Sequence, residues 1–186
     1  MSKHGKRTNQ NRIPLSASTI NVQKIIDEAN SGNMYHAYLL LTTVLIEQET
    51  LAVDRIVELW NEANQYADNH LAKLPDTTPA VREIEEIIGL HTPYPQIDFS
   101  AIRTQGDLAV MKRKLKRNAL HAAFCTIALG FRATRQFTDD QLRLMFLNAD
   151  ITLAEVECGM TTFDRLQSVI QAHGIIIKDR TKTASA

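Results

Sequence analysis

One stretch of sequence decides the fold of this chain, namely residues 105–133, QGDLAVMKRKLKRNALHAAFCTIALGFRA. Its inward residues recur every three or four positions, which is the spacing that places side chains on one face of an α-helix. They are Leu108, Met111, Leu115, Ala119, Ala122, Thr126 and Leu129. The second half of the stretch is apolar on almost every side, which is typical of a helix with neighbours on several faces. The sequence therefore predicts a central helix that is buried around Leu120, Phe124 and Ile127.

Helical spacing and capping signals on both sides of this stretch predict further helices. Ser16 or Ser18 can cap a first helix, and Thr78-Pro79 is typical of a helix start. Thr138-Asp139-Asp140-Gln141 matches a capping box, and Thr161 and Thr162 precede another helical run. We therefore expect helices over about 16–46, 52–71, 78–88, 105–133, 138–159 and 162–173. The predicted fold is all-α, an irregular helical bundle of about six helices with at most a short C-terminal strand at 175–177.

The first predicted helix contains the interruption Asn30-Ser31-Gly32-Asn33. Glycine in a helix interior costs about 1 kcal/mol relative to alanine. Both a kink and a complete break are open at this point.

Composition and charge divide the chain into five parts. We expect a flexible basic arm at 1–15, an acidic N-terminal helical lobe at 16–89, a connection at 90–106, a basic C-terminal helical lobe at 107–178 and a tail at 179–186. At 186 residues one compact unit is the default, and the connection, with Pro93 and Pro95, is the candidate boundary if there are two lobes.

The net charge of zero hides a strong asymmetry along the chain. Residues 20–102 contain four Lys or Arg against thirteen Asp or Glu, whereas residues 103–186 contain thirteen against eight. Such polarity favours a charged macromolecular partner or self-association, including a homodimer.

Sequence signals for catalysis, cofactors and metals are absent. There is no phosphate-binding loop, nucleotide-binding glycine fingerprint or Gly-x-Ser-x-Gly elbow, and the six histidines show no paired metal-ligand spacing. Cys125 and Cys158 lie in apolar helical patterns, so we expect two reduced, buried thiols. The most apolar run, residues 37–46, falls short of the ~20 residues that span a bilayer. We therefore expect a non-enzymatic cytoplasmic protein, with no cofactor, metal or membrane partner.

The most distinctive local feature is a run of cations, Lys112-Arg113-Lys114-Leu115-Lys116-Arg117. At about 100° per residue the five cations cover one broad helix face, and Leu115 lies opposite. Such a face can hold successive phosphates of DNA or RNA, or an acidic partner, with Arg7 and Arg12 of the basic arm as further contacts. The alternative is an ordinary solvated helix face.

Carboxylates form a second charged pattern in the middle of the chain. Three of them recur every four residues and three more cluster on the next predicted helix: Asp54, Glu58, Glu62, Glu83, Glu85 and Glu86. A carboxylate stripe can imitate a row of phosphates and so contact a basic partner. A solubilising surface is the alternative.

The opening Arg7-Thr8-Asn9-Gln10-Asn11-Arg12-Ile13-Pro14-Leu15-Ser16, followed by a long helix, resembles small proteins encoded by prophages and mobile elements of Gram-positive bacteria. That group has an uninterrupted helix where this chain has Asn30–Asn33. The resemblance implies an inhibitor of a host nucleoprotein defence effector, of the anti-CRISPR type that acts on Cas9 with its guide RNA. A nucleic-acid-binding accessory or regulatory protein that uses the basic run is the alternative.

Overall fold

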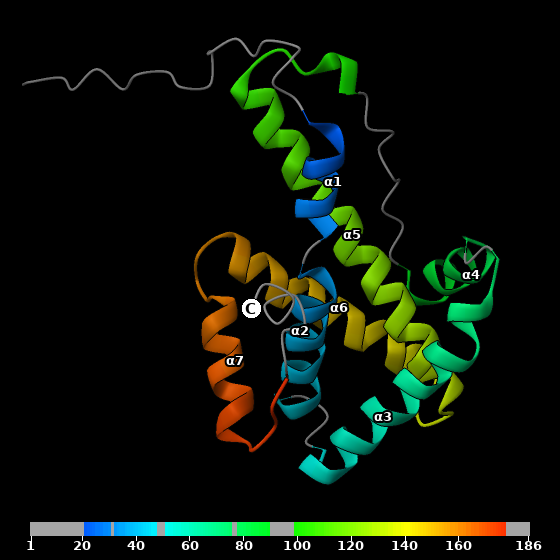
Figure 1. The fold of residues 1–186 in the computed structure, drawn as a ribbon. Coiled ribbons are helices and arrows are strands. Elements are labelled where there is room, and N and C mark those ends of the chain that lie inside the picture. Colours follow the sequence, from blue (N-terminus) through cyan, green and yellow to red (C-terminus); the bar gives the residue numbers. More distant parts are fainter. Residues whose placement is uncertain (1–20, 31, 48–50, 76–77, 90–98, 178–186) are drawn as a thin grey trace, which may run out of the picture. The chain divides into compact units, whose positions relative to one another are not determined.

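The computed structural model describes residues 21–30, 32–47, 51–75, 78–89 and 99–177 (Figure 1). These ranges form seven α-helices and two short 3-10 helices and contain no strand, so the predicted all-α fold is confirmed. The helices are α1 Val22–Asn30, α2 Asn33–Glu47, α3 Val53–Asn69, η3 Leu71–Lys73, α4 Thr78–Ile88, η4 Phe99–Ala101, α5 Gln105–Ala133, α6 Asp139–Glu157 and α7 Phe163–Ala172. The basic arm, with Arg7 and Arg12, and the tail lie outside the described residues.

The interruption near residue 32 separates two helices, α1 and α2. Gly32 has a φ of +77°, a left-handed conformation that glycine adopts without a steric penalty. The helix expected over 16–46 is thus two elements within its described part, which is why seven α-helices are found where about six were expected.

The chain divides into two compact units, and each contains segments that are distant in sequence. Unit 1 comprises residues 1–31 and 93–119, and unit 2 comprises residues 32–92 and 120–186. This division differs from the lobes expected at 16–89 and 107–178. Composition changes at the proline-containing connection, whereas packing joins α1 to the first half of α5 and leaves the second half of α5 in unit 2.

Side-chain caps fix the starts of α5, α6 and α7. At α5, Thr104 Oγ1 accepts from the Asp107 amide at 3.1 Å, and Asp107 Oδ2 accepts from the Thr104 amide at 2.9 Å. A hydrogen bond from the Thr104 side chain, followed by those from the Arg103 and Thr104 amides, holds the pKa of Asp107 below its usual value. The predicted capping box of Thr138 and Gln141 opens α6, and the Thr162 side chain caps α7, so both predicted starts are confirmed.

Two helices lie at the centre of the unit 2 core. The second half of α5 is buried as predicted, with Leu120, Phe124 and Ile127 each at most 5% exposed. Helix α2 is buried on every side from Leu39 to Leu45 and contacts α3, α6 and α7 (Figure 1). Aliphatic side chains from α3, α4, α6 and α7 pack around both, and burial of each such side chain stabilises the fold by roughly 1.5–3 kcal/mol.

One sequence prediction in unit 2 is wrong, and one possibility that the sequence left open is not realised. Cys158 is exposed, because it follows Ile151 and Ala154 by seven and four residues on the side of α6 that faces solvent. Residues 175–177 form no strand, and no other strand is present in the described ranges to pair with them. Ile175 instead packs into the hydrophobic core at 6% exposed.

Helices α3 and α5 approach each other closely at Gly130. A Cβ atom on this residue would lie 2.9 Å from Ala63 Cβ and 3.0 Å from the Ala63 carbonyl oxygen. Both distances are shorter than ordinary contact, and the second involves backbone, which cannot rotate away. Glycine is therefore required at this position by packing and not by backbone conformation.

We predict that Gly130→Ala destabilises the protein by about 1–3 kcal/mol, although alanine is the better helix former by about 1 kcal/mol. Urea unfolding followed by circular dichroism measures the change. In a double variant with Ala63→Gly the loss should be smaller than the sum of the two single losses, because the nearest clashing atom is gone. A Gly130→Ala variant as stable as the parent would contradict this packing.

Candidate functional site

The basic surface of unit 1 consists of the five cations at residues 112–117 of α5. Arg113, Lys114, Lys116 and Arg117 are exposed to solvent. Lys112 is half-exposed, and its Nζ donates to Glu28 Oε2 of α1 at 2.8 Å. The structure therefore leaves most of the predicted cationic face accessible.

Beside this surface lies a groove of about 380 Å³ between α1 and α5. Ile25, Glu28, Lys112, Arg113 and Lys116 line it. Ile25 is only 6% exposed, so the groove lining combines one largely buried apolar side chain with three cations and the Glu28 carboxylate. A groove of this composition suits an anionic ligand with some apolar surface.

The pKa of Glu28 shows the effect of the lysines around it. Its pKa is held below the usual value, first by the hydrogen bond from Lys112, then by the charge of Lys112, and further by the charges of Lys24 and Lys116. The described residues of unit 1 contain seven Lys or Arg against three Asp or Glu. One carboxylate thus lies among several cations, and the unit keeps a positive balance.

The predicted acidic residues all lie in unit 2, where four of the six make contacts within the unit. Glu58 pairs with Arg55 on α3, and Glu62 Oε2 accepts from Gln136 Nε2 at 2.8 Å. Glu83 Oε1 accepts from Arg132 Nη1 at 2.7 Å, and Glu85 contacts His121. Asp54 and Glu86 are exposed. The structure therefore does not gather the six carboxylates into one free stripe.

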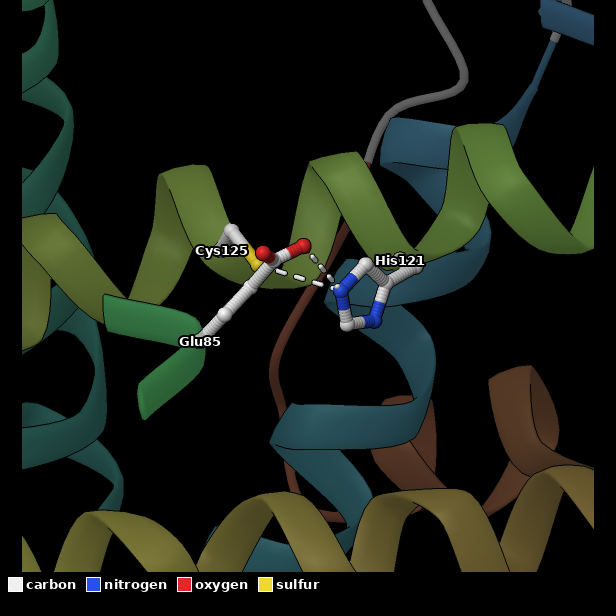
Figure 2. Close-up of side chains that lie close together, drawn as sticks. All are labelled: Glu85, His121 and Cys125. Atoms are coloured by element: carbon white, nitrogen blue, oxygen red, sulfur yellow. Dashed lines mark hydrogen bonds and ion pairs between the residues drawn. The ribbon is translucent and has the colours of Figure 1, made fainter. Parts of the chain in front are cut away.

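A cluster of three side chains lies inside unit 2, between α4 and α5. His121 Nε2 is 2.8 Å from Glu85 Oε1 and 3.6 Å from Cys125 Sγ, and Figure 2 shows both groups facing the same ring nitrogen. The side chains of His121 and Glu85 are 8% and 16% exposed, and Cys125 is fully buried. Burial, and secondarily the charge of Glu85, raises the pKa of the Cys125 thiol to about 12.

This arrangement is unsuited to nucleophilic catalysis. In a catalytic triad the nucleophile and the carboxylate contact opposite nitrogens of the histidine ring, so that one orients the base while the other is activated. Here both contact Nε2. A buried thiol with a raised pKa is also protonated near neutral pH and is a poor nucleophile.

No family model, curated protein or solved structure matches this chain. Within the part of the chain that the structure describes, no helix combines the length and apolar character needed to cross a membrane. The residues themselves must therefore carry any functional argument.

The buried cluster was not predicted, although the sequence contains the spacing of two of its three residues. His121 and Cys125 are four residues apart, which places them one turn apart on the same helix face. The predicted absence of a metal site rested on the spacing of the histidines, whereas this pair joins a histidine to a cysteine. Glu85 is 36 residues away and reaches the pair only through packing of α4 on α5, which the sequence does not show.

We predict that Glu85→Gln destabilises the protein by about 1–3 kcal/mol, because His121 loses a charged hydrogen-bond partner in a buried site. The neighbouring Glu86→Gln is the matched control, and since Glu86 is exposed its effect should stay within about 0.5 kcal/mol. Urea unfolding in the presence of a chelator measures both. Equal stability of the two variants would show that the buried contact contributes nothing.

Proposed function

We propose that this protein binds nucleic acid through the phosphate backbone, using the basic surface of α5, and that it acts by binding without turnover. The observation that supports this most strongly is the exposure of Arg113, Lys114 and Lys116 at a groove whose lining includes three cations. Lysine and arginine are the residues that contact phosphates most often in protein–DNA interfaces. The acidic residues offer less support for a basic protein partner, because most of them are engaged within unit 2.

The spacing of the cations suits contacts to successive phosphates. Residues 112–117 rise about 7.5 Å along the helix axis, close to the axial rise of about two nucleotides in a DNA strand. Flexible lysine and arginine side chains extend that reach on both sides of the helix. Such contacts position a protein on a duplex without reading bases, so we expect affinity with little sequence preference.

The mobile-element resemblance supports a more specific version of this function. In that version the phosphates belong to a host nucleoprotein effector, such as Cas9 with its guide RNA, whose heteroduplex lies in a charged channel. The expected result is stoichiometric inhibition of Cas9 cleavage by purified protein, and loss of inhibition in Arg113→Glu/Lys116→Glu. Unchanged cleavage at large molar excess would remove this version and leave general nucleic-acid binding in place.

For the general function we predict that Arg113→Glu/Lys116→Glu weakens duplex DNA binding by at least ~10-fold. It should also reduce the slope of log affinity against log salt by about 2, because two phosphate contacts are lost. Fluorescence anisotropy over a range of salt concentrations measures both. The matched control is Lys73→Glu/Arg165→Glu, which makes the same change in net charge at exposed positions of unit 2 and should leave the slope unchanged.

A third variant, Glu28→Gln, tests the same surface in the opposite direction. It removes the carboxylate that holds Lys112, so DNA binding should become tighter.

If Arg113→Glu/Lys116→Glu and Lys73→Glu/Arg165→Glu weaken DNA binding equally, the response is to net charge alone, and binding at the basic surface is contradicted.

A further inference from the structure

The buried cluster of Glu85, His121 and Cys125 brings together three different metal-ligating side chains. Their ligand atoms all lie within 4.8 Å of one another. Two come from adjacent turns in the second half of α5 and the third comes from α4, so all three residues belong to unit 2. As Figure 2 shows, the carboxylate and the sulfur both point at the histidine nitrogen instead of away from it.

The nitrogen–sulfur distance fits an ion placed between the three atoms, whereas the nitrogen–oxygen distance would have to change as the ion binds. Zinc lies about 2.0–2.1 Å from histidine nitrogen, about 2.3 Å from cysteine sulfur and about 2.0–2.2 Å from carboxylate oxygen. Tetrahedral angles then separate nitrogen and sulfur by about 3.5 Å, and nitrogen and oxygen by about 3.4 Å. The observed nitrogen–sulfur separation is 3.6 Å. The nitrogen–oxygen separation of 2.8 Å would have to open by roughly half an ångström as the ion replaces the hydrogen bond.

Charge also favours a divalent cation at this position. A thiolate and a carboxylate together carry two negative charges, and a divalent cation with neutral imidazole makes the whole cluster neutral. Neutrality matters here because isolated charges are costly inside a protein. Binding would displace the proton that burial holds on Cys125, so the ion and the proton compete for this sulfur.

The donor set indicates which class of metal would bind. Calcium and magnesium prefer oxygen ligands throughout, so a site with one sulfur, one nitrogen and one oxygen disfavours them. Zinc and cobalt accept this mixture in tetrahedral geometry. A fourth ligand, either water or the second carboxylate oxygen of Glu85, completes the coordination.

We propose that Glu85, His121 and Cys125 form a binding site for one divalent cation of the zinc class, which links α4 to α5 inside unit 2. The site is independent of nucleic-acid binding, since it shares no residue with the basic surface. Because the ligands are buried, the role of the ion is to stabilise the packing of these two helices. The competing account is a hydrogen-bonded Glu85–His121 pair beside a neutral thiol.

The test uses Co²⁺ as the probe and the reduced, metal-free Cys158→Ser variant as the protein. The chain has two cysteines and Cys158 is the exposed one, so this variant keeps Cys125 as its sole thiol. We expect a thiolate-to-Co²⁺ charge-transfer absorption that saturates at one ion per chain and disappears when Zn²⁺ is added. No absorption at excess Co²⁺ would overturn the proposal. The measurement needs no substitution inside the cluster, so a failure to fold cannot obscure it.

A matched pair of variants in the same background tests the full ligand set. Cys158→Ser with Glu85→Gln should bind Co²⁺ at least ~10-fold more weakly, whereas Cys158→Ser with Glu86→Gln should bind as tightly as the parent. Equal affinities in both variants would show that the sulfur holds the ion without Glu85, and the three-residue site would be refuted.

Discussion

Burial of the second half of α5 is the constraint on which the rest of the structure depends. An α-helix satisfies its own backbone hydrogen bonds, so it can pass through a core at no cost in unpaired polar groups. Residues 120–131 use this freedom and contact α3 at Gly130, α4 at His121 and α6 at Phe124. The same helix also carries the cations at 112–117. These remain in contact with water, because the buried part of α5 begins near residue 120.

The two units differ in the charged side chains that a partner could contact. Several carboxylates of unit 2 contact a cation, an amide or a histidine of the same unit, and Arg132 contacts both Glu83 and Asp139. These bonds raise the pKa of Arg132, and they pair its charge with carboxylates of the same unit. In unit 1 the cations outnumber the carboxylates, and Glu28 is the carboxylate that contacts the basic surface. A net charge of zero for the whole chain therefore conceals a cationic region.

The sequence predicted local structure well and contacts between distant residues poorly. The bounds of α5, the capping box at Thr138 and the burial of Phe124 all follow from spacing and capping rules that act within a few residues. The exposure of Cys158 did not follow, because it depends on which side of α6 the other helices cover. The pairing of Glu83 with Arg132 and the approach of Glu85 to His121 did not follow either, since they arise when α4 packs on α5. The cationic face could be predicted because all its residues lie on one helix. The buried cluster could not, because its residues come from two helices.

The most direct test of the central claim, that α5 is buried at one end and binds phosphate at the other, is amide hydrogen exchange with and without duplex DNA at low salt. Without DNA, amides at 120–131 should exchange only through global unfolding, and amides at 106–119 should exchange faster through local opening. With DNA, new protection should appear at 108–119 and in α1, and not in α6 or α7. Uniform protection along α5, or DNA-dependent protection confined to unit 2, would contradict this account.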